Sequence, residues 1–434
     1  MRWLEVKQTS NISGHVSIPG SKNSSLALLP AAMLTSDKVI IDGIPDIYDV
    51  RVIRKIAESI GVEMHLDSGE SCVINAANVE NAELPIAMTS SFRASYYFVG
   101  ALLHKCKSVT LGYPGGDNFV DRPIDQHMKV FRSFGAEIIQ GHDRYTVIAD
   151  KLSGCEIYFD MITSGATMNA VLLAVLAEGT TKLRNAATDP EVVDLCNMLN
   201  LMGAQIAGAG TDVIRIQGVK KLHGCTYKVI PDRLIASAFL MTVGLTKGTI
   251  TVHNVIPEHM KSCLYKLQEV GIEIDVKEDS ITASCKGIIR ATRVRTGMYP
   301  IFYTDIQQPM TSLLLMAEGK SIITDPVYPH RFSHVPELNK LGADIKVRSG
   351  TALIKGGNML YGGIVHATDV RAGTCLIMAG LAAEGVTRIT GIEHVERGYA
   401  DIVRLYESAG ISIRKCEGDL HRTIADDCEF TPTA

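Results

Sequence analysis

The chain has 434 residues, 46% of them hydrophobic, and its 43 basic and 47 acidic residues leave a formal net charge of −4. This length exceeds what one hydrophobic core usually supports, so we expect at least two domains. The charges are interspersed, which disfavours nucleic acid as a partner, and the apolar runs are too short for a membrane helix or a signal peptide, which predicts a cytoplasmic protein.

The first predicted helix starts at Lys22. Residues 15–18 alternate like a strand, a Pro-Gly turn follows, and Ser21 is expected to cap the helix. Lys22 and Asn23 then lie at the helix start, where free backbone N–H groups, the helix dipole and the ammonium group all favour an anion. Because most lysines are merely solvated, this pattern alone does not establish a site.

A short phrase recurs six times along the chain, as SIGVEM, SFGAEI, LMGAQI, EVGIEI, KLGADI and SAGISI. In each copy a glycine follows a helix-like stretch and precedes an alternating strand, where it suits the left-handed end of a helix. Consecutive copies stand 68 to 74 positions apart, at Gly61, Gly135, Gly203, Gly271, Gly342 and Gly410. We therefore expect six repeated units of about 70 residues.

A second glycine phrase precedes the first in four units and predicts another helix end before another strand. Its glycines are Gly179, Gly248, Gly319 and Gly385. Each unit thus reads α-β-α-β, and six such units group most naturally as three plus three. The stretch around Pro231 lies near the middle and is our candidate for the crossing between halves, whose cleft is a usual place for a small-molecule site.

A loop at residues 112–127 contains the adjacent Gly115 and Gly116, followed by Asp117 and Arg122. Aspartate after glycine is most often a turn residue. Mobile loops also carry catalytic residues unusually often. Composition alone favours the turn.

Two aspartates stand ahead of predicted helices at equivalent places in neighbouring repeats, Asp305 and Asp369, and Arg371 follows the second. Taken singly, each aspartate fits a helix cap with a surface ion pair better than a functional role. His127 and His334 are likewise predicted to be structural residues.

Taken together, ten motifs in fixed order resemble the UDP-N-acetylglucosamine enolpyruvyl transferase family, which belongs to one superfamily with 5-enolpyruvylshikimate-3-phosphate synthase. The resemblance extends to about Lys415. The motifs are PGSKN at 19–23, FRAS at 92–95, PGGD…RPIDQH at 114–127, SGAT at 164–167, DPEVVD at 189–194, IPDR at 230–233, TD at 304–305, HRFSHVPEL at 330–338, ATDVRA at 367–372 and ERGY at 396–399.

The resemblance implies two inside-out α/β barrel domains, each of three repeats, with internal helices and an active site between them. The first domain would comprise residues 22–229 and carry a mobile catalytic loop at 112–122. The second would combine residues 1–21 with 230–434 and end in a polar tail from about residue 416.

The implied activity is the first committed step of peptidoglycan synthesis. Enolpyruvyl passes from phosphoenolpyruvate to the 3-hydroxyl of UDP-N-acetylglucosamine, and phosphate leaves through a tetrahedral ketal. No metal or organic cofactor is implied, and the ten cysteines, with no C-x-x-C pair, predict reduced thiols and no metal site. We expect a monomer or weak homo-oligomer, with no nucleic acid or membrane partner.

The matching motifs also assign roles. The residues expected to bind phosphoenolpyruvate are Lys22, Arg93, Arg122, Arg371 and Arg397. Those expected to bind the sugar nucleotide are Asn23, Arg93, Arg122, Pro123, Ile124, Asp125, Gln126, Thr163, Ser164, Gly165, Asp305, Val327 and Arg331. Those expected to serve catalysis are Lys22, Asp117, Asp305, Asp369 and Arg397. The two substrates bring about five negative charges, which these cations would hold.

Two aspartates, Asp305 and Asp117, carry the implied proton transfers. Asp305 corresponds to the family's base for the sugar hydroxyl, and Asp369 to a residue near the reacting carbons. Asp117 occupies the position of the family's usual cysteine, which protonates the methylene carbon of phosphoenolpyruvate. An aspartate can donate that proton if a closed, drier site beside two anions disfavours its carboxylate.

Four positions depart from the family pattern, Tyr48 (usually Lys), Tyr97 (usually Trp), Gln126 (usually Leu) and Met161 (often basic). Three of them lie near the expected sugar nucleotide. They leave open another acceptor, such as a nucleoside or shikimate 3-phosphate, although PGSKN and PGGD disfavour the latter. A further alternative is an inactive paralogue that only binds the sugar nucleotide, which retention of the charged residues disfavours.

Overall fold

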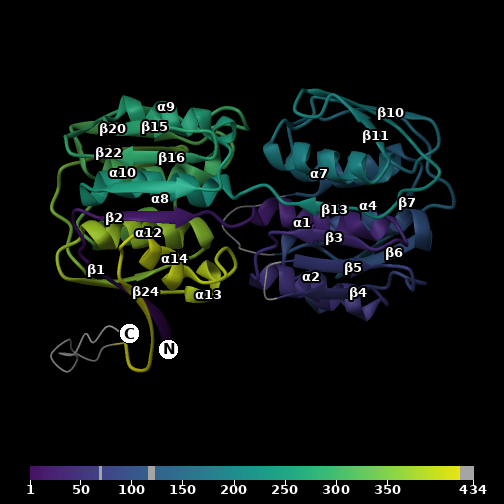
Figure 1. Cartoon of the computed structure of the whole chain (residues 1–434), viewed down its shortest axis with the longest axis horizontal. Coiled ribbons are helices and arrows are strands. Elements are labelled where there is room, and N and C mark those ends of the chain that lie inside the picture. Colours follow the sequence, from purple (N-terminus) through teal and green to yellow (C-terminus); the bar gives the residue numbers. More distant parts are fainter. Residues whose placement is uncertain (68–70, 116–122, 421–434) are drawn as a thin grey trace.

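The computed structural model describes residues 1–67, 71–115 and 123–420, which form two lobes of similar design (Figure 1). One hydrophobic core is built from residues between Leu26 and Val229. The other combines residues between Leu4 and Ile18 with residues between Leu234 and Ile413. The N-terminal strands therefore belong with the C-terminal part of the chain.

Six central helices, three in each lobe, are buried on nearly every side. All 14 residues of α8 (Arg233–Thr246), for example, are buried. A helix that is apolar all round must be enclosed by protein, which explains why the strands lie outside these helices. The other five central helices are α1 (Lys22–Ala31), α4 (Tyr97–Cys106), α6 (Ser164–Ala174), α10 (Gln307–Leu314) and α12 (Val370–Ala382).

An outer helix accompanies each central one and shows a polar face to solvent. The six outer helices are α2 (Tyr48–Ser59), α5 (Asp125–Ser133), α7 (Pro190–Leu201), α9 (Lys261–Glu269), α11 (His334–Lys340) and α14 (Ile402–Ser408). Two short helices, α3 (Ile86–Thr89) and α13 (Ile392–Val395), lie between units. Among the described residues no helix combines the length and apolar character needed to span a bilayer.

The strands of the first lobe form three sheets. In hydrogen-bonded order these are β13 (Thr226–Lys228), β3 (Val39–Asp42), β5 (Ser71–Asn75) and β4 (Glu63–Leu66); β6 (Ser108–Gly112), β8 (Arg144–Ile148) and β7 (Glu137–Gln140); and β9 (Glu156–Tyr158), β10 (Thr180–Arg184), β12 (Val213–Gln217) and β11 (Gln205–Ala207).

The second lobe repeats this plan. Its sheets are β2 (Ser13–Ser17), β14 (Thr249–His253), β16 (Ser280–Ser284) and β15 (Glu273–Val276); β18 (Arg293–Arg295), β20 (Lys320–Thr324), β22 (Thr351–Lys355) and β21 (Asp344–Arg348); and β23 (Ile364–His366), β24 (Val386–Thr390), β1 (Arg2–Lys7) and β25 (Ile413–Glu417). A small pair, β17 (Ile289–Arg290) and β19 (Ala317–Glu318), lies beside them.

The predicted α/β class with six repeated units is confirmed. Most units contain more strands than predicted. An antiparallel hairpin such as β4 and β5 follows the outer helix in five of the six units, and a parallel strand such as β13 joins five of the six sheets. The six cap glycines all have positive φ, from 73° at Gly410 to 100° at Gly271 and Gly342. Each sheet keeps its own ladder, and none closes into a continuous barrel among the described residues.

The predicted helix end at Gly248 is confirmed, because α8 ends at Thr246 and β14 begins at Thr249, but its geometry differs from that of the other three. Gly179, Gly319 and Gly385 have positive φ, but at the end of α8 the left-handed residue is Lys247, not Gly248. A Cβ on Gly248 would lie 2.3 Å from the carbonyl oxygen of Ile12. The glycine therefore serves close backbone approach rather than a left-handed turn.

Two chain segments cross between the lobes side by side, near the predicted Pro231. The N–H of Ser21 donates to the carbonyl of Ile230 at 2.7 Å. The N–H of Asp232 donates to the carbonyl of Pro19 at 2.9 Å. Gly20 has no room for a side chain here, since a Cβ would lie 1.8 Å from a backbone oxygen of Gly43. The lobes are thus joined by two paired strands rather than by one linker.

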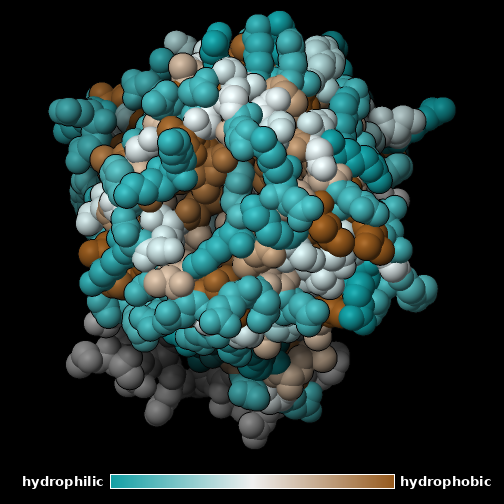
Figure 2. Space-filling view, turned by 90° about the vertical axis from the view of Figure 1, so that its right-hand side faces the viewer, coloured by the Kyte–Doolittle hydropathy of each residue, from teal (hydrophilic) through white to brown (hydrophobic). Residues whose placement is uncertain are grey.

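The outer end of the first lobe carries interspersed polar and apolar residues. Figure 2 shows this end, with hydrophilic residues over most of the face and apolar patches scattered between them. Such a surface fits a chain whose charges are spread along the sequence.

Leu240 tests the buried α8, because its side chain is fully enclosed. We expect Leu240→Ala to lower the free energy of unfolding by about 2–5 kcal/mol through lost contacts and a residual cavity. Urea unfolding followed by the fluorescence of Trp3, the single tryptophan and a residue of the same lobe, measures this. The control Leu353→Ala, in β22 of the same lobe and 41% exposed, should change it by less than about 1 kcal/mol. Equal effects would contradict this account of the core.

Candidate active site

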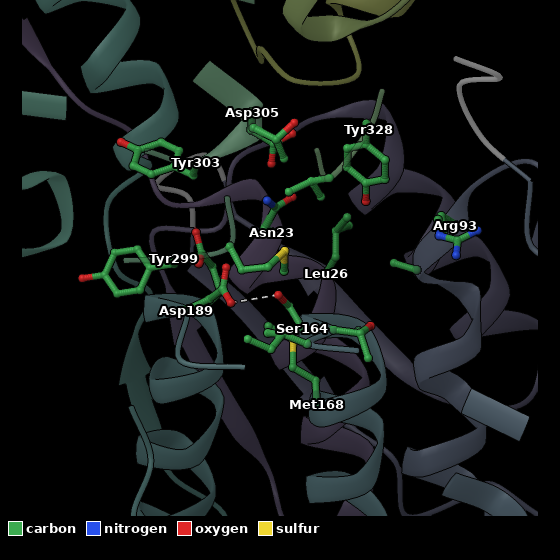
Figure 3. A pocket seen from close by; sticks show the side chains of 18 of the residues that line it. Asn23, Leu26, Arg93, Ser164, Met168, Asp189, Tyr299, Tyr303, Asp305 and Tyr328 are labelled. Carbon is green, nitrogen blue, oxygen red and sulfur yellow. Dashed lines mark hydrogen bonds between the residues drawn. The ribbon is translucent and has the colours of Figure 1, made fainter. Parts of the chain in front are cut away.

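A cavity of about 720 Å³ lies between the lobes and is lined by both (Figure 3). Four central helices begin at its wall. Each start is capped by a side chain that accepts backbone N–H groups, Ser21 for α1, Thr163 for α6, Asp232 for α8 and Asp369 for α12. The positive ends of several helix dipoles therefore meet at one place, which favours anions.

Lys22 and Arg397 come together at one side of this cavity although they belong to different lobes. Both hold the carboxylate of Asp49 in the first turn of α2. Lys22 Nζ lies 2.9 Å from Asp49 Oδ2, and Arg397 Nη2 lies 3.1 Å from Oδ1. The Asp49 carboxylate is only 4% exposed. The predicted phosphoenolpyruvate grip thus carries an internal anion that the sequence analysis did not identify.

Asp305 pairs with Arg331 at another part of the wall. Arg331 Nη1 donates to Asp305 Oδ1 at 2.6 Å, and the Arg331 side chain is 4% exposed. Burial alone would raise the pKa of Asp305, but the charges of Arg331 and Arg371 and the hydrogen bond outweigh it and lower the pKa to about 2. Asp305 is therefore ionised and ready to accept a proton, yet in this arrangement it is a weak base.

Asp369 is mainly a helix cap. Its Oδ1 accepts the N–H groups of Arg371 and Ala372, at 2.8 and 3.1 Å, and its Oδ2 accepts the amide of Gln308 at 3.4 Å. The carboxylate is buried at the cavity wall. This geometry fits the interpretation of Asp369 as a helix cap. That Asp369 lies beside the reacting carbons stays a prediction.

The predicted nucleotide end contains a network around Gln126. The Gln126 amide donates to Asp125 at 2.9 Å and to Asp160 at 3.0 Å, and its carbonyl accepts the N–H of Asp160. Lys129 also pairs with Asp160. Gln126, where the family usually has Leu, therefore holds two carboxylates in place. Met161, which is 59% exposed at the rim of the cavity, stands where the family often has a basic residue.

His127 is a neutral hydrogen-bond group at this wall. Burial lowers its pKa to about 3. The amide nitrogen of Asn169, which can only donate, lies 3.1 Å from Nδ1, so the proton of the neutral ring is on Nε2. A Cβ on Gly165 would lie 2.7 Å from the hydroxyl oxygen of Tyr96 and 3.2 Å from Nε2, so a side chain here would require a shift of the Tyr96 ring. His334, also buried, lies outside the cavity lining, and burial lowers its pKa to about 3 as well.

A buried ionic cluster, which the sequence analysis did not predict as part of the site, joins the two lobes. Arg233 of α8 makes a two-pronged contact with Glu191 of α7, both bonds 3.1 Å long, and lies 3.7 Å from Asp189. Asp189 accepts the hydroxyl of Ser164 at 2.9 Å, the contact drawn in Figure 3. Burial, then the nearby Glu191, raise the pKa of Asp189.

The sequence did contain a signal for this cluster, because the motifs DPEVVD and IPDR hold all three residues. No role could be assigned without knowing that the two motifs meet. Asp49 had no comparable signal, since its segment matches no motif.

Nearly all predicted site residues that the structure describes line this one cavity. They are Lys22, Asn23, Arg93, Pro123, Asp125, Gln126, Thr163, Ser164, Gly165, Asp305, Val327, Arg331, Asp369, Arg371 and Arg397. Ile124 is the exception, because its side chain packs against the core of the first lobe. Asp117 and Arg122 lie outside the described residues.

Of the two tyrosines that depart from the family pattern, Tyr97 lines the cavity and Tyr48 does not. Tyr97 is buried and directs its hydroxyl to the sulfur of Met168 at 3.1 Å. Tyr48 begins α2 with its side chain 49% exposed. The nine cysteines among the described residues are free.

The known proteins that resemble this chain are carboxyvinyltransferases. The profile of the EPSP synthase (3-phosphoshikimate 1-carboxyvinyltransferase) family matches residues 6–405. UDP-N-acetylglucosamine 1-carboxyvinyltransferase 2 of Geobacillus kaustophilus is 43% identical over 95% of this chain and 96% of its own. The UDP-N-acetylglucosamine 1-carboxyvinyltransferase of Clostridium botulinum is 44% identical over 95% of this chain and 99% of its own.

A solved structure shares the whole fold. The enolpyruvyl transferase NikO of Streptomyces tendae superposes with a TM-score of 0.87 at 26% identity, covering 95% of this chain and 98% of its own. Two lobes of one repeated α/β unit around a cavity rich in cations define the class as an enzyme of the EPSP synthase family. Within it, the chain belongs to the UDP-N-acetylglucosamine 1-carboxyvinyltransferases. The predicted resemblance is thereby confirmed, whereas the role of Asp117 stays a prediction.

Arg331 should control the basicity of Asp305. Replacing it as Arg331→Gln removes the closest positive charge, so the pKa of Asp305 should rise by about 1–2 units. Protonation would then disable the base at higher pH, and the acid limb of kcat/KM should move toward neutral. A pH profile of phosphate release measures this, with Arg51→Gln, an exposed guanidinium, as control. A higher KM with an unmoved acid limb would show that Arg331 only binds substrate.

Proposed function

We propose that the protein transfers the enolpyruvyl group of phosphoenolpyruvate to the 3-hydroxyl of UDP-N-acetylglucosamine and releases phosphate, the first committed step of peptidoglycan synthesis. The observation that carries this proposal is the meeting of Lys22, Arg371 and Arg397 with Asp305 in one cavity. The names of relatives more than 40% identical over 95% of the chain support the acceptor.

The proposed chemistry has two stages that balance without a cofactor. In the addition, Asp305 takes the proton of the sugar hydroxyl, its oxygen bonds to C2 of phosphoenolpyruvate, and Asp117 protonates C3. In the elimination, the Asp117 carboxylate takes a proton from C3, the C2–O bond to phosphate breaks and the C2–C3 double bond re-forms. The proton held by Asp305 leaves with phosphate, so both carboxyl groups return to their starting states. Charge stabilisation by preorganised donors is the main contribution expected of the protein.

The weak basicity of Asp305 makes this assignment depend on substrate binding. When anions occupy the cavity, they offset the charges of Arg331 and Arg371 that hold the Asp305 pKa near 2. Asp305 then becomes a stronger base when the hydroxyl has arrived. The base is thus activated by the substrates it serves.

The remaining assignments are proposals of the same kind. Phosphoenolpyruvate is bound by Lys22, Arg93, Arg122, Arg371 and Arg397. The sugar nucleotide is bound by Asn23, Arg93, Arg122, Pro123, Ile124, Asp125, Gln126, Thr163, Ser164, Gly165, Asp305, Val327 and Arg331. Among these, the side chain of Ile124 packs against the core of the first lobe. We propose residues 22–229 and 1–21 plus 230–434 as the two domains because each set holds one hydrophobic core, and we place the enzyme in the cytoplasm, as a monomer or weak homo-oligomer.

Phosphate release with a panel of acceptors tests this function. We expect turnover of phosphoenolpyruvate with UDP-N-acetylglucosamine and none with shikimate 3-phosphate or a nucleoside. Arg397→Ala should lower kcat/KM by about a hundredfold or more, since it removes a cation at the reacting anion. Turnover with a different acceptor alone would refute the acceptor, and phosphate release by none would favour a protein that only binds.

Asp117 should determine sensitivity to fosfomycin, an epoxide that inactivates family members by alkylating a cysteine thiolate at this position. A carboxylate is a poor match, so we expect the unmodified enzyme to resist it. Asp117→Cys should keep measurable turnover and become sensitive, whereas Asp117→Ala should lose turnover. Time-dependent inactivation of the unmodified enzyme, with an adduct seen by mass spectrometry, would contradict this assignment.

A further inference from the structure

Asp49 contacts two of the cations proposed to bind phosphoenolpyruvate, Lys22 and Arg397. It comes from the first lobe, in the first turn of α2, where a negative charge suits the helix dipole. Arg397 reaches it from the second lobe with two nitrogens, Nε and Nη2, each 3.1 Å from Oδ1. Lys22 Nζ holds the other oxygen at 2.9 Å.

Burial makes this contact strong. Lys22 and Arg397 are each 14% exposed and Asp49 is 4% exposed, so water screens their charges little. Two cations this close would repel each other without an anion between them. Asp49 therefore supplies, within the protein, the negative charge that an anionic substrate would bring.

We propose that Asp49 competes with the anionic groups of phosphoenolpyruvate and of the released phosphate for Lys22 and Arg397. This inference rests on the proposed function in one respect, that these two cations bind phosphoenolpyruvate. An incoming phosphate or carboxylate displaces Asp49 from one or both cations, and Asp49 returns when the anion leaves. The residue lowers the affinity for anions and thereby speeds the departure of phosphate.

The other cations of the cavity show why Asp49 is the relevant one. Arg233 is paired with Glu191 and Asp189, and Arg331 is paired with Asp305, which has its own role in the proposed reaction. Asp49 has no role in the proposed proton transfers. Its carboxylate is therefore free to serve as a counter-anion alone.

The test replaces Asp49 by its neutral isostere, Asp49→Asn, in the full chain. Inorganic phosphate binding, measured by isothermal titration calorimetry in a buffer without other polyvalent anions, should become about tenfold tighter, because the internal competitor is gone. In steady-state assays KM for phosphoenolpyruvate should fall, and kcat should fall with it where phosphate release limits turnover. Asp49→Glu, which keeps the charge, should restore values near those of the unmodified protein.

A matched control lies three residues earlier. Asp46→Asn removes an exposed carboxylate, 50% exposed and paired with Arg51, and should leave phosphate affinity and KM unchanged. Thermal unfolding of all variants checks that they fold. If Asp49→Asn does not fold, Asp49→Ser replaces it in the same comparison.

Two results would overturn the proposal. Weaker phosphate binding and a higher KM in Asp49→Asn would show that Asp49 positions the two cations for the substrate. Unchanged phosphate binding and KM would show that it neither competes nor positions. Phosphate binding is measured without turnover, so the two proposals can fail separately. If Asp49→Asn binds phosphate more tightly but the unmodified enzyme turns over no acceptor, the proposed function is refuted and the competition between Asp49 and phosphate stands.

Discussion

The free N–H groups at the start of every buried helix are the constraint on which this structure depends. A helix leaves its first N–H groups without partners, and a helix enclosed on all sides cannot give them to water. Four such starts meet at the cavity, where caps such as Ser21 and Asp369 satisfy part of the requirement. Anionic ligands can satisfy more of it. The packing that buries the helices and the site that binds anions are therefore one arrangement.

Asp232 extends this constraint to the junction between the lobes. Its Oδ1 accepts two N–H groups of α8, and its Oδ2 accepts the N–H of Lys22 at the start of α1, 3.2 Å away. One carboxylate thus caps helices of both lobes beside the paired crossing strands. The position of the Lys22 side chain depends on a helix cap 210 residues away in the sequence.

Local chemistry explains what could be predicted from the sequence. The cap glycines, the N-cap at Ser21 and the helix periodicity each depend on a few neighbouring residues, and the structure agrees. The extra strand of each hairpin was missed because segments such as Ser71–Asn75 are short and lie between turns. The site was predicted only through the resemblance, since no single motif excluded a cap or surface ion pair.

Pairings between the lobes could not be predicted in this way. Asp49 and Arg397 are 348 positions apart, and no local pattern reports that contact. Counting the cations against the substrate charges was likewise incomplete. In the structure Asp49 is already paired with Lys22 and Arg397, and Asp305 is paired with Arg331. The affinity of these cations for an anion is the difference between their interactions with the substrate and their interactions with carboxylates of the protein. The sequence does not show which carboxylates these are.

The place of β1 has a consequence for the order in which the chain is made. Its residues pair with β24 on one side, Leu4 opposite Ile389, and with β25 on the other, Trp3 opposite Cys416. During synthesis this strand emerges first, but both of its neighbours emerge among the last. The first lobe can complete its core while translation continues, whereas the N-terminal strand must wait for almost the entire chain. Until then its apolar residues remain open to chaperones.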